Sequence, residues 1–305
     1  MQKLLVICGP TATGKSDLAV FLAKKFDGEI ISADSRQVYR DLNIGTGKIT
    51  KSEMQGVPHY LLDVISPKKT FSVAEWQKQT QEKIEDILSR GKLPILCGGT
   101  GFYIKSIVDN ITLPAILPNK KLRQELEKKS LSELVAMLKK LDPEKLKTID
   151  QKNPVRLIRA IEIAGVVGKV PALKKRQTIY DVLEIGLKLS KEKLEEKIYN
   201  RLIKRLEIGM IDEAKNLKKS GLSYKRMESL GLEYRYLARY LQNKLTKEEF
   251  VNQLNIKIRQ YAKRQMTWFK KDKRIVWFDV SQPRYIEKVE KLTKKWFNTK
   301  YAKKN

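Results

Sequence analysis

The sequence is poor in cysteine, glycine and proline, with 2, 16 and 10 of them in 305 residues. These numbers exclude a disulfide scaffold, a collagen-like repeat and a low-complexity disordered chain. No apolar run approaches the roughly 20 residues of a membrane-spanning helix, and the apolar start is too brief for a signal peptide. Cys8 and Cys97 both end apolar runs, where cysteine usually serves as a small buried hydrophobe. We therefore expect a cytoplasmic protein with reduced thiols and no membrane attachment.

Charge is abundant and mostly positive. The chain carries 63 Lys and Arg against 35 Asp and Glu, a formal net charge of +28. Residues 1–110 are nearly balanced, with 15 basic and 12 acidic side chains, whereas residues 111–305 hold 48 basic and 23 acidic side chains. A lysine-rich composition that merely solvates every helix would hardly separate the charges in this way. The asymmetry predicts that the later part of the chain meets a polyanion such as nucleic acid.

Strand and helix patterns alternate over the first hundred residues. An apolar run, a Gly/Thr loop, an amphipathic helix and a second apolar run form a β–α–β pattern over residues 3–34. Ser72 and Glu75 have the spacing of a capping box, so a helix should begin there and end near Gly91, before a strand at 93–97. This alternation predicts an α/β fold with a parallel sheet covered by helices.

The pattern changes after about residue 112, where prolines interrupt the chain and Lys-rich helical segments follow. Apolar periodicity predicts later strands at 182–189 and 274–280, and long amphipathic helices at about 191–219 and 247–271.

Two domains follow from this organisation. We expect residues 1–112 and about 181–305 to form a P-loop α/β core with C-terminal helices. Residues from about 113 to 180 should form a helical insertion.

Residues 9–16 match the phosphate-binding pattern G-x-x-x-x-G-K-[ST]. The pattern lies between an expected strand and an expected helix, a context that favours a phosphate loop over an ordinary Gly-rich turn. Its backbone N–H groups, the helix N-terminus and the Lys15 ammonium would all face the anion, and Ser16 is placed to bind Mg²⁺. The expected pyrophosphate-binding residues are Gly9, Pro10, Thr11, Ala12, Thr13, Gly14, Lys15 and Ser16.

Two further loops should lie beside this one. Asp34 follows the second expected strand, and Thr100 lies in the Gly-rich loop after the strand 93–97. Ligands of open parallel sheets bind at the carboxyl ends of the strands. Asp34 could act as a general base or a metal ligand, or it could simply cap a helix. Thr100 could donate to a phosphate oxygen, or it could only stabilise a turn.

The strand 93–97 ends in Cys97 and glycines, without the aspartate that holds Mg²⁺ and the attacking water in a standard ATPase. The sequence therefore predicts phosphate binding without the usual hydrolysis machinery. Either a kinase-like transfer or a reaction that expels pyrophosphate fits.

Cations, amides and aromatic side chains are interleaved over residues 259–271. Lysines and arginines there can follow a phosphate backbone, and aromatic planes can stack on unpaired bases. The aromatic members could equally be core residues. Arg156 and Arg159 lie three apart and would share one helical face, where they could grip phosphate or remain a solvated surface.

Five segments resemble the tRNA dimethylallyltransferases, also called tRNA isopentenyltransferases, in order and spacing. They are GPTATGKS (9–16), DSRQVYR (34–40), GGTGFY (98–103), NPVRLIRAIE (153–162) and RQYAKRQMTWF (259–269). Without a Cys/His zinc motif after the core, the chain is similar to the bacterial form. The resemblance implies transfer of a dimethylallyl group from its pyrophosphate to the exocyclic amine of adenosine 37 in the tRNA anticodon loop, with Mg²⁺ as cofactor.

The resemblance also implies roles for individual residues. Asp34 would accept the amine proton, and Lys15 and Thr100 would stabilise the departing pyrophosphate. The adenosine would have to flip out of its stack to reach the phosphate loop. The residues implied in tRNA binding are Asp34, Ser35, Arg36, Gln37, Thr100, Arg123, Arg156, Arg159, Lys263, Arg264, Gln265, Met266, Thr267 and Trp268.

The chain departs from the family pattern at three places. Gly45–Ile49 reads GTGKI where members often have GTAKP, and His59-Tyr60 stands where they often have paired histidines. Residues 230–234 read LGLEY in place of a sequence like IGYKE. These changes concern RNA contact more than chemistry, and they argue against His59, the only histidine, as an essential acid or base.

Other functions stay open at this stage. A small-molecule P-loop kinase would have no need of the basic region, and an isopentenyltransferase for free adenine nucleotides would have no need of the basic helix. A non-catalytic RNA-binding protein would leave Asp34 and Thr100 without a role. Since no self-complementary motif is visible, we expect a monomer.

Overall fold

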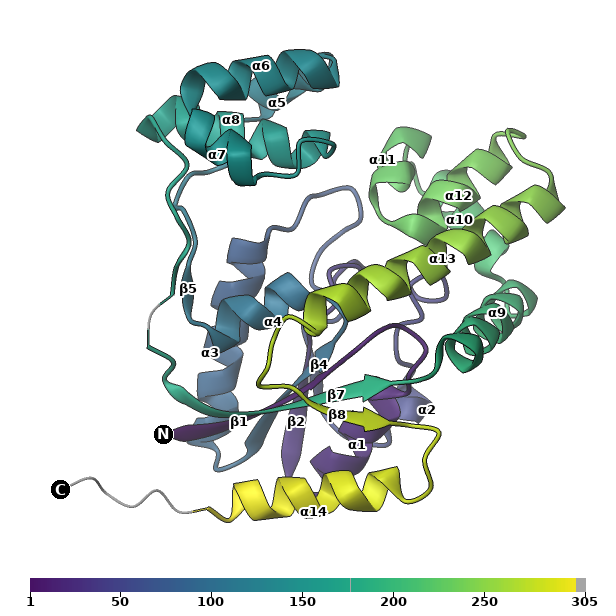
Figure 1. Cartoon of the computed structure of the whole chain (residues 1–305). Coiled ribbons are helices and arrows are strands. Elements are labelled where there is room, and N and C mark those ends of the chain that lie inside the picture. The colour runs from purple at the N-terminus through teal and green to yellow at the C-terminus, as the bar shows by residue number, and fades with distance from the viewer. Residues whose placement is uncertain (176, 300–305) are drawn as a thin grey trace. The chain divides into compact units, whose positions relative to one another are not determined.

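The computed structural model describes residues 1–175 and 177–299 (Figure 1). These residues form two compact units. The first comprises residues 1–110 and 177–299, and the second comprises residues 111–175. Each unit has its own hydrophobic core.

The first unit is built on a six-stranded sheet in the order β3-β2-β4-β1-β7-β8, and every neighbouring pair of strands is parallel. The inner strands are apolar and buried because helices cover both faces of the sheet. The strands are β1 (Gln2–Cys8), β2 (Gly28–Ser32), β3 (His59–Tyr60), β4 (Leu93–Gly98), β7 (Tyr180–Lys188) and β8 (Val276–Asp279).

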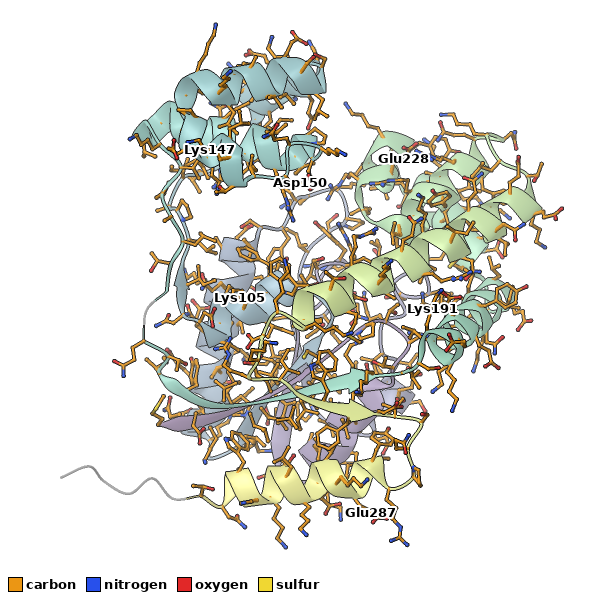
Figure 2. All side chains as sticks on the ribbon, viewed as in Figure 1. Lys105, Lys147, Asp150, Lys191, Glu228 and Glu287 are labelled. Atoms are coloured by element: carbon orange, nitrogen blue, oxygen red, sulfur yellow. The ribbon has the colours of Figure 1, made fainter. Side chains whose placement is uncertain are left out.

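Successive residues of β1 point to opposite faces of the sheet. Leu5 and Ile7 pack with the core of α1 (Lys15–Lys25) and α14 (Tyr285–Phe297) on one face. Leu4 and Val6 pack on the other face, in a core that includes Trp76. Figure 1 shows α14 running along the first face, and Figure 2 shows Glu287 on the solvent side of that helix. This arrangement is the α/β fold that the strand–helix alternation predicts.

The second face carries most of the remaining helices of the first unit. They are α3 (Val73–Ser89), α4 (Gly101–Val108), α9 (Lys191–Glu207), α10 (Met210–Lys219), α11 (Tyr224–Ser229), α12 (Leu232–Leu241) and α13 (Lys247–Phe269), and α2 (Lys51–Met54) is a single turn in the loop before β3. The expected capping box of α3 is present, because Ser72 accepts from the Glu75 N–H and Glu75 accepts from the Ser72 N–H.

The prediction of one helix over 191–219 is wrong. Gly209 has φ +99°, a left-handed conformation that ends α9 and starts α10. The turn lets α10 pack back on α9 and α12.

The second unit packs four helices around a small apolar core that includes Leu134, Leu138 and Leu157. Its elements are α5 (Lys120–Leu126), α6 (Leu131–Leu141), α7 (Pro143–Thr148) and α8 (Pro154–Val167), together with the short antiparallel pair β5 (Ile111–Thr112) and β6 (Lys174–Lys175). In residues 1–175 and 177–299, no helix is both long and apolar enough to cross a membrane.

Candidate active site

Three loops meet at the carboxyl ends of β1, β4 and β2, which are neighbours in the sheet. The Ala33 N–H donates to the Cys97 carbonyl at 2.8 Å, and the Thr100 N–H donates to the Ala33 carbonyl at 3.0 Å. A Cβ on Gly98 would lie 2.2 Å from the Ala33 carbonyl oxygen, so only glycine allows this approach. The topology therefore places the phosphate loop, Asp34 and Thr100 at one edge of the sheet, as the sequence predicts.

The loop over residues 9–14 curls tightly before α1. Gly9 and Gly14 adopt φ +135° and +78°, and the Thr13 hydroxyl donates to the Pro10 carbonyl at 2.9 Å. The Lys15 ammonium donates to the same carbonyl at 2.7 Å. Burial lowers the pKa of Lys15 to about 8, because a desolvated ammonium lacks a full counter-charge. The loop and Lys15 form a site that would bind an anion strongly.

Asp34 shapes its own loop with one of its two oxygens. Its Oδ1 accepts from the backbone N–H groups of Arg36 at 2.8 Å and Gln37 at 3.4 Å. The described residues supply no hydrogen bond to Oδ2, and the side chain is only half-buried. The sequence allows a helix cap at Asp34, but a turn follows instead, and Oδ1 stabilises that turn. The second oxygen can still accept a proton.

Thr100 connects the third loop to the second. Its Oγ1 accepts from the Ser35 N–H at 3.0 Å. A hydroxyl that accepts in this way can still donate its proton elsewhere. Asp34 and Thr100 therefore lie in bonded loops at the same sheet edge, where a carboxylate can accept a proton and a hydroxyl can donate a hydrogen bond.

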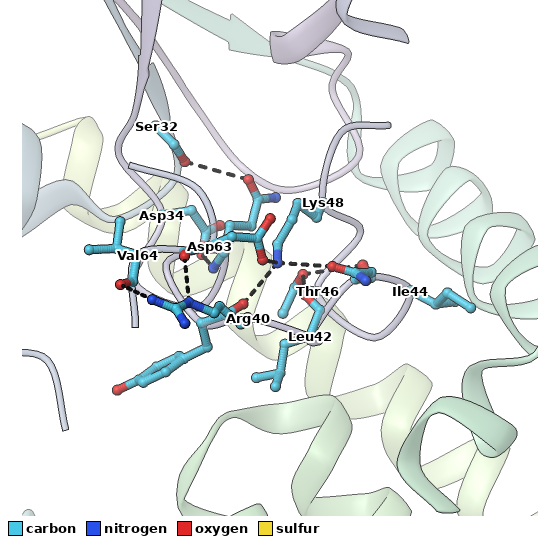
Figure 3. A network of polar contacts seen from close by, with 12 residues as sticks. Ser32, Asp34, Arg40, Leu42, Ile44, Thr46, Lys48, Asp63 and Val64 are labelled. Carbon is cyan, nitrogen blue, oxygen red and sulfur yellow. Dashed lines mark hydrogen bonds and ion pairs between the residues drawn. The ribbon is translucent and has the colours of Figure 1, made fainter. Parts of the chain in front are cut away.

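A second stretch of the same long loop is fixed by polar contacts (Figure 3). The Gln37 amide donates to the Gly47 carbonyl at 3.2 Å, and the Lys48 ammonium donates to the Tyr39 carbonyl at 2.8 Å. The carboxylate of Glu213 on α10 accepts from the N–H groups of residues 43–45 at 2.7–3.0 Å. The wall of the site is therefore assembled from α10 as well as from the loop itself.

Two arginines of α9 reach this wall, and the sequence motifs predict neither of them. Arg201 donates to the Thr11 hydroxyl at 3.3 Å, and Arg205 lies 3.6 Å from Glu233 and donates to the Gly45 carbonyl at 3.4 Å. Burial and the neighbouring Arg205 lower the pKa of Arg201 to about 10. Their i, i+4 spacing places them on one helix face, but nothing in the sequence shows that this face meets the phosphate loop.

Gly47 makes room for both arginines. It has φ +60°, and a Cβ there would lie 1.9 Å from Arg205 Nη2 and 2.8 Å from Arg201 Nη2. Gly47 is one of the departures from the family pattern. Its missing side chain leaves the space in which two guanidinium groups pack beside the phosphate loop.

The 259–271 segment forms the C-terminal part of α13 and the turn after it, and it presents two faces. Phe269 and Gln265 are buried, whereas Lys263, Arg264 and Thr267 are exposed. Met266 is half-buried. A hollow of about 350 Å³ lies on this helix, lined by Gln260, Lys263, Arg264, Thr267, Trp268 and Lys271.

Trp268 lies at the border of the two faces. It is 38% exposed, and its indole fills the space where Gly101 lacks a side chain, since a Cβ there would lie 2.1 Å from Trp268 Cδ1. Its ring meets Phe102 edge to face, with centroids 6.5 Å apart. The exposed part of the indole therefore lies next to the loop of Thr100.

Three of the five arginines expected to bind tRNA, Arg123, Arg156 and Arg159, lie in the second unit. Arg123 and Arg159 both pair with the buried carboxylate of Glu162, which also accepts from the Asn119 N–H. Burial would raise the pKa of Glu162, but these hydrogen bonds outweigh it and hold the pKa near 2. Arg156 is exposed, 3.8 Å from Asp150. Arg123 and Arg159 thus stabilise the unit, and the triad keeps one net positive charge.

A model of the IPP transferase family matches residues 37–272. The tRNA dimethylallyltransferase of Anoxybacillus flavithermus is 42% identical over 292 residues, which cover 94% of this chain and 93% of the relative. The tRNA dimethylallyltransferase of Caldicellulosiruptor saccharolyticus is 40% identical and covers 95% of this chain, with 97% of its own length matched.

Solved structures agree with this match. The tRNA isopentenylpyrophosphate transferase of Bacillus halodurans has a TM-score of 0.74 and 36% identity, with 97% of each chain covered. A eukaryotic dimethylallyltransferase studied while acting on tRNA has a TM-score of 0.79 and 25% identity, with 100% of this chain and 82% of that chain covered. The chain therefore belongs to the IPP transferase family of transferases.

Proposed function

We propose that this protein transfers a dimethylallyl group from dimethylallyl pyrophosphate to the exocyclic amine of adenosine 37 in tRNA, releasing pyrophosphate. The observation that carries the proposal is the meeting of an anion-binding loop with Asp34 and Thr100 at one sheet edge. The names of the relatives supply the donor and the acceptor. The same names argue against a small-molecule kinase and against a transferase for free nucleotides.

The reaction breaks the bond between the allylic carbon and a pyrophosphate oxygen, and it forms a bond from that carbon to the adenine nitrogen. The amine proton passes to Asp34 Oδ2, and the electron pair of the broken bond leaves with the pyrophosphate. An adenine amine is a weak nucleophile because its lone pair is delocalised, so a base beside it accelerates attack.

The leaving group needs positive charge and hydrogen-bond donors that are already in place. Lys15, Arg201 and the N–H groups at the start of α1 would supply them. The Thr11 N–H is already bonded to the Gln265 side chain at 2.9 Å, so Thr11 would contribute through its hydroxyl. Thr100 would donate to the bridging oxygen as the bond to carbon lengthens.

Magnesium would assist the departure of pyrophosphate by neutralising its charge. Among the described residues, no group of three or more acidic, histidine or cysteine side chains could hold a metal ion. Ser16 is exposed in the first turn of α1, where its hydroxyl is available. This donor set fits Mg²⁺, which usually binds through substrate phosphates, water and few protein ligands.

The tRNA would be held by the exposed face of α13 and by the loop after Asp34. Lysines and arginines would contact phosphates there, and Trp268 would stack on an unpaired base. The residues we assign to this surface are Ser35, Arg36, Gln37, Lys263, Arg264, Met266, Thr267 and Trp268. Within the second unit, exposed Arg156 and the net positive charge that Arg123 and Arg159 keep beside Glu162 would attract tRNA phosphates. Because tRNA and the donor are cytoplasmic molecules, we place the protein in the cytoplasm. We also propose that it acts as a monomer.

The test uses purified protein, unmodified tRNA, dimethylallyl pyrophosphate and Mg²⁺, followed by digestion to nucleosides and mass spectrometry. Prenylated adenosine should form, and it should disappear when position 37 is changed to another base. Binding of tRNA should weaken steeply between about 50 and 200 mM salt. Steady ATP turnover without prenylated product would contradict the proposal and favour the kinase.

A further inference from the structure

Gln265 lies on the buried face of α13 and is only 7% exposed. Its Oε1 accepts from the Thr11 N–H at 2.9 Å, and its Nε2 donates to the Gly99 carbonyl at 2.9 Å. A Cβ on Gly99 would lie 2.2 Å from this Nε2, so the loop is shaped around the amide. Both ends of the side chain are therefore bonded within the protein, which differs from the tRNA contact that the resemblance implies.

The two bonds join the phosphate loop to the loop of Thr100, which is itself bonded to the loop of the proposed base. Thr11 belongs to the loop that would hold the leaving pyrophosphate. Gly99 precedes Thr100, whose hydroxyl accepts from the Ser35 N–H, and Ser35 follows Asp34. A continuous path of bonded groups thus runs from the phosphate loop through Gln265 to the proposed base.

We propose that Gln265 is a positioning residue that holds the phosphate loop and the Thr100 loop in register, so that binding of pyrophosphate also orders the acceptor side. This inference rests on the proposed function, because the reaction defines the roles of the two loops. The physical reason is geometric: displacing reacting groups by about 1 Å can reduce the rate by about 10²-fold. An amide suits the task because it donates and accepts at once.

The first experiment compares Gln265→Met, Gln265→Glu and Gln253→Met. Methionine fills a similar volume without the two hydrogen bonds, and Gln253 is a partly exposed glutamine near the other end of the same helix. We expect Gln265→Met to lower kcat by roughly 10- to 100-fold with little change in KM for tRNA, and Gln253→Met to match the wild type. A rise in KM for tRNA at unchanged kcat would overturn the proposal in favour of a tRNA contact.

Gln265→Glu adds a pH dependence of activity that a residue needed only for packing would not produce. A protonated carboxyl group can donate to the Gly99 carbonyl and accept from the Thr11 N–H, as the amide does, whereas a carboxylate cannot donate. The activity of this variant, divided by that of the wild type at each pH, should rise on acidification from pH 8 to pH 6. The same ratio for Gln265→Met should stay level. Level ratios for both variants would contradict the proposal.

A second experiment needs no turnover. Hydrogen exchange is followed with inorganic pyrophosphate as the probe, in the wild type and in Gln265→Met. Pyrophosphate should slow exchange at residues 9–16 and 98–101 of the wild type, but only at residues 9–16 of the variant. Equal protection of residues 98–101 in both proteins would overturn the coupling. If the expected pattern appears while the wild type makes no prenylated tRNA, the proposed function fails and the coupling stands.

Discussion

The hydroxyl of Thr100 accepts a hydrogen bond from the backbone N–H of Ser35 at 3.0 Å. This bond ties the loop after β4 to the loop after β2, and it orients the hydroxyl proton away from Ser35. The bond also explains why a threonine follows the two glycines. Gly98 allows the loops to approach each other, and the hydroxyl then joins them.

Replacement of Thr100 by valine should test both roles of the hydroxyl. Valine keeps the shape of the side chain but neither accepts from Ser35 nor donates to the leaving group. We expect kcat for prenyl transfer to fall by about 10²-fold, the lower range for a lost donor to developing charge. Thr100→Ser should retain most of the activity. Equal loss in both variants would mean that the methyl group matters and the hydroxyl does not.

Replacement of Asp34 by asparagine should separate loop shape from basicity. The asparagine Oδ1 can still accept from the N–H groups of Arg36 and Gln37, so the loop should keep its form. Turnover should fall by at least about 10²-fold, the low end for a lost general base. Single-turnover rates and filter binding would measure chemistry and tRNA affinity separately. Near-normal transfer by this variant would show that Asp34 is not the general base.

Pyrophosphate binding should depend on pH through Lys15. Burial lowers the pKa of this ammonium to about 8 in the free protein, and the anion binds the protonated form. The affinity for pyrophosphate should therefore be highest well below pH 8, where Lys15 is protonated, and should fall as the pH rises through 8. Calorimetry with inorganic pyrophosphate would measure it, and Lys15→Arg serves as reference because a guanidinium stays charged. A constant affinity ratio between the two proteins from pH 6.5 to 9.5 would contradict the assignment.

Alanine at position 47 should destabilise the first unit. Gly47 has φ +60°, where an L-residue costs about 1–2 kcal/mol, and its Cβ would collide with Arg205. Gly56 provides the control, because it has φ +81° with no atom within 4 Å of the place that a Cβ would take. Denaturant unfolding should show a larger loss for Gly47→Ala than for Gly56→Ala. Pyrophosphate affinity should fall in the first variant only, since Arg201 and Arg205 would be displaced.

Local sequence rules identified the elements whose patterns are complete within a few residues. The phosphate loop, the strands that precede Asp34 and Thr100, and the capping box of α3 all follow from such patterns. Parallel pairing then requires that the three loops share one edge. The continuous helix expected over 191–219 from apolar periodicity is wrong, because Gly209 adopts φ +99° and ends the first helix.

Long-range contacts decided the rest. Arg201 and Gln265 lie 190 and 254 residues from Thr11 in the sequence, yet both bond to it. Arg123 and Arg159 resemble RNA-binding residues in sequence, but a buried Glu162 engages both. The sequence by itself identified the loop to which we assign the anion, because a short Gly-rich pattern and one lysine suffice to predict it. Only the tertiary structure decided which distant cations and amides complete the site, because their positions depend on how helices pack on the sheet.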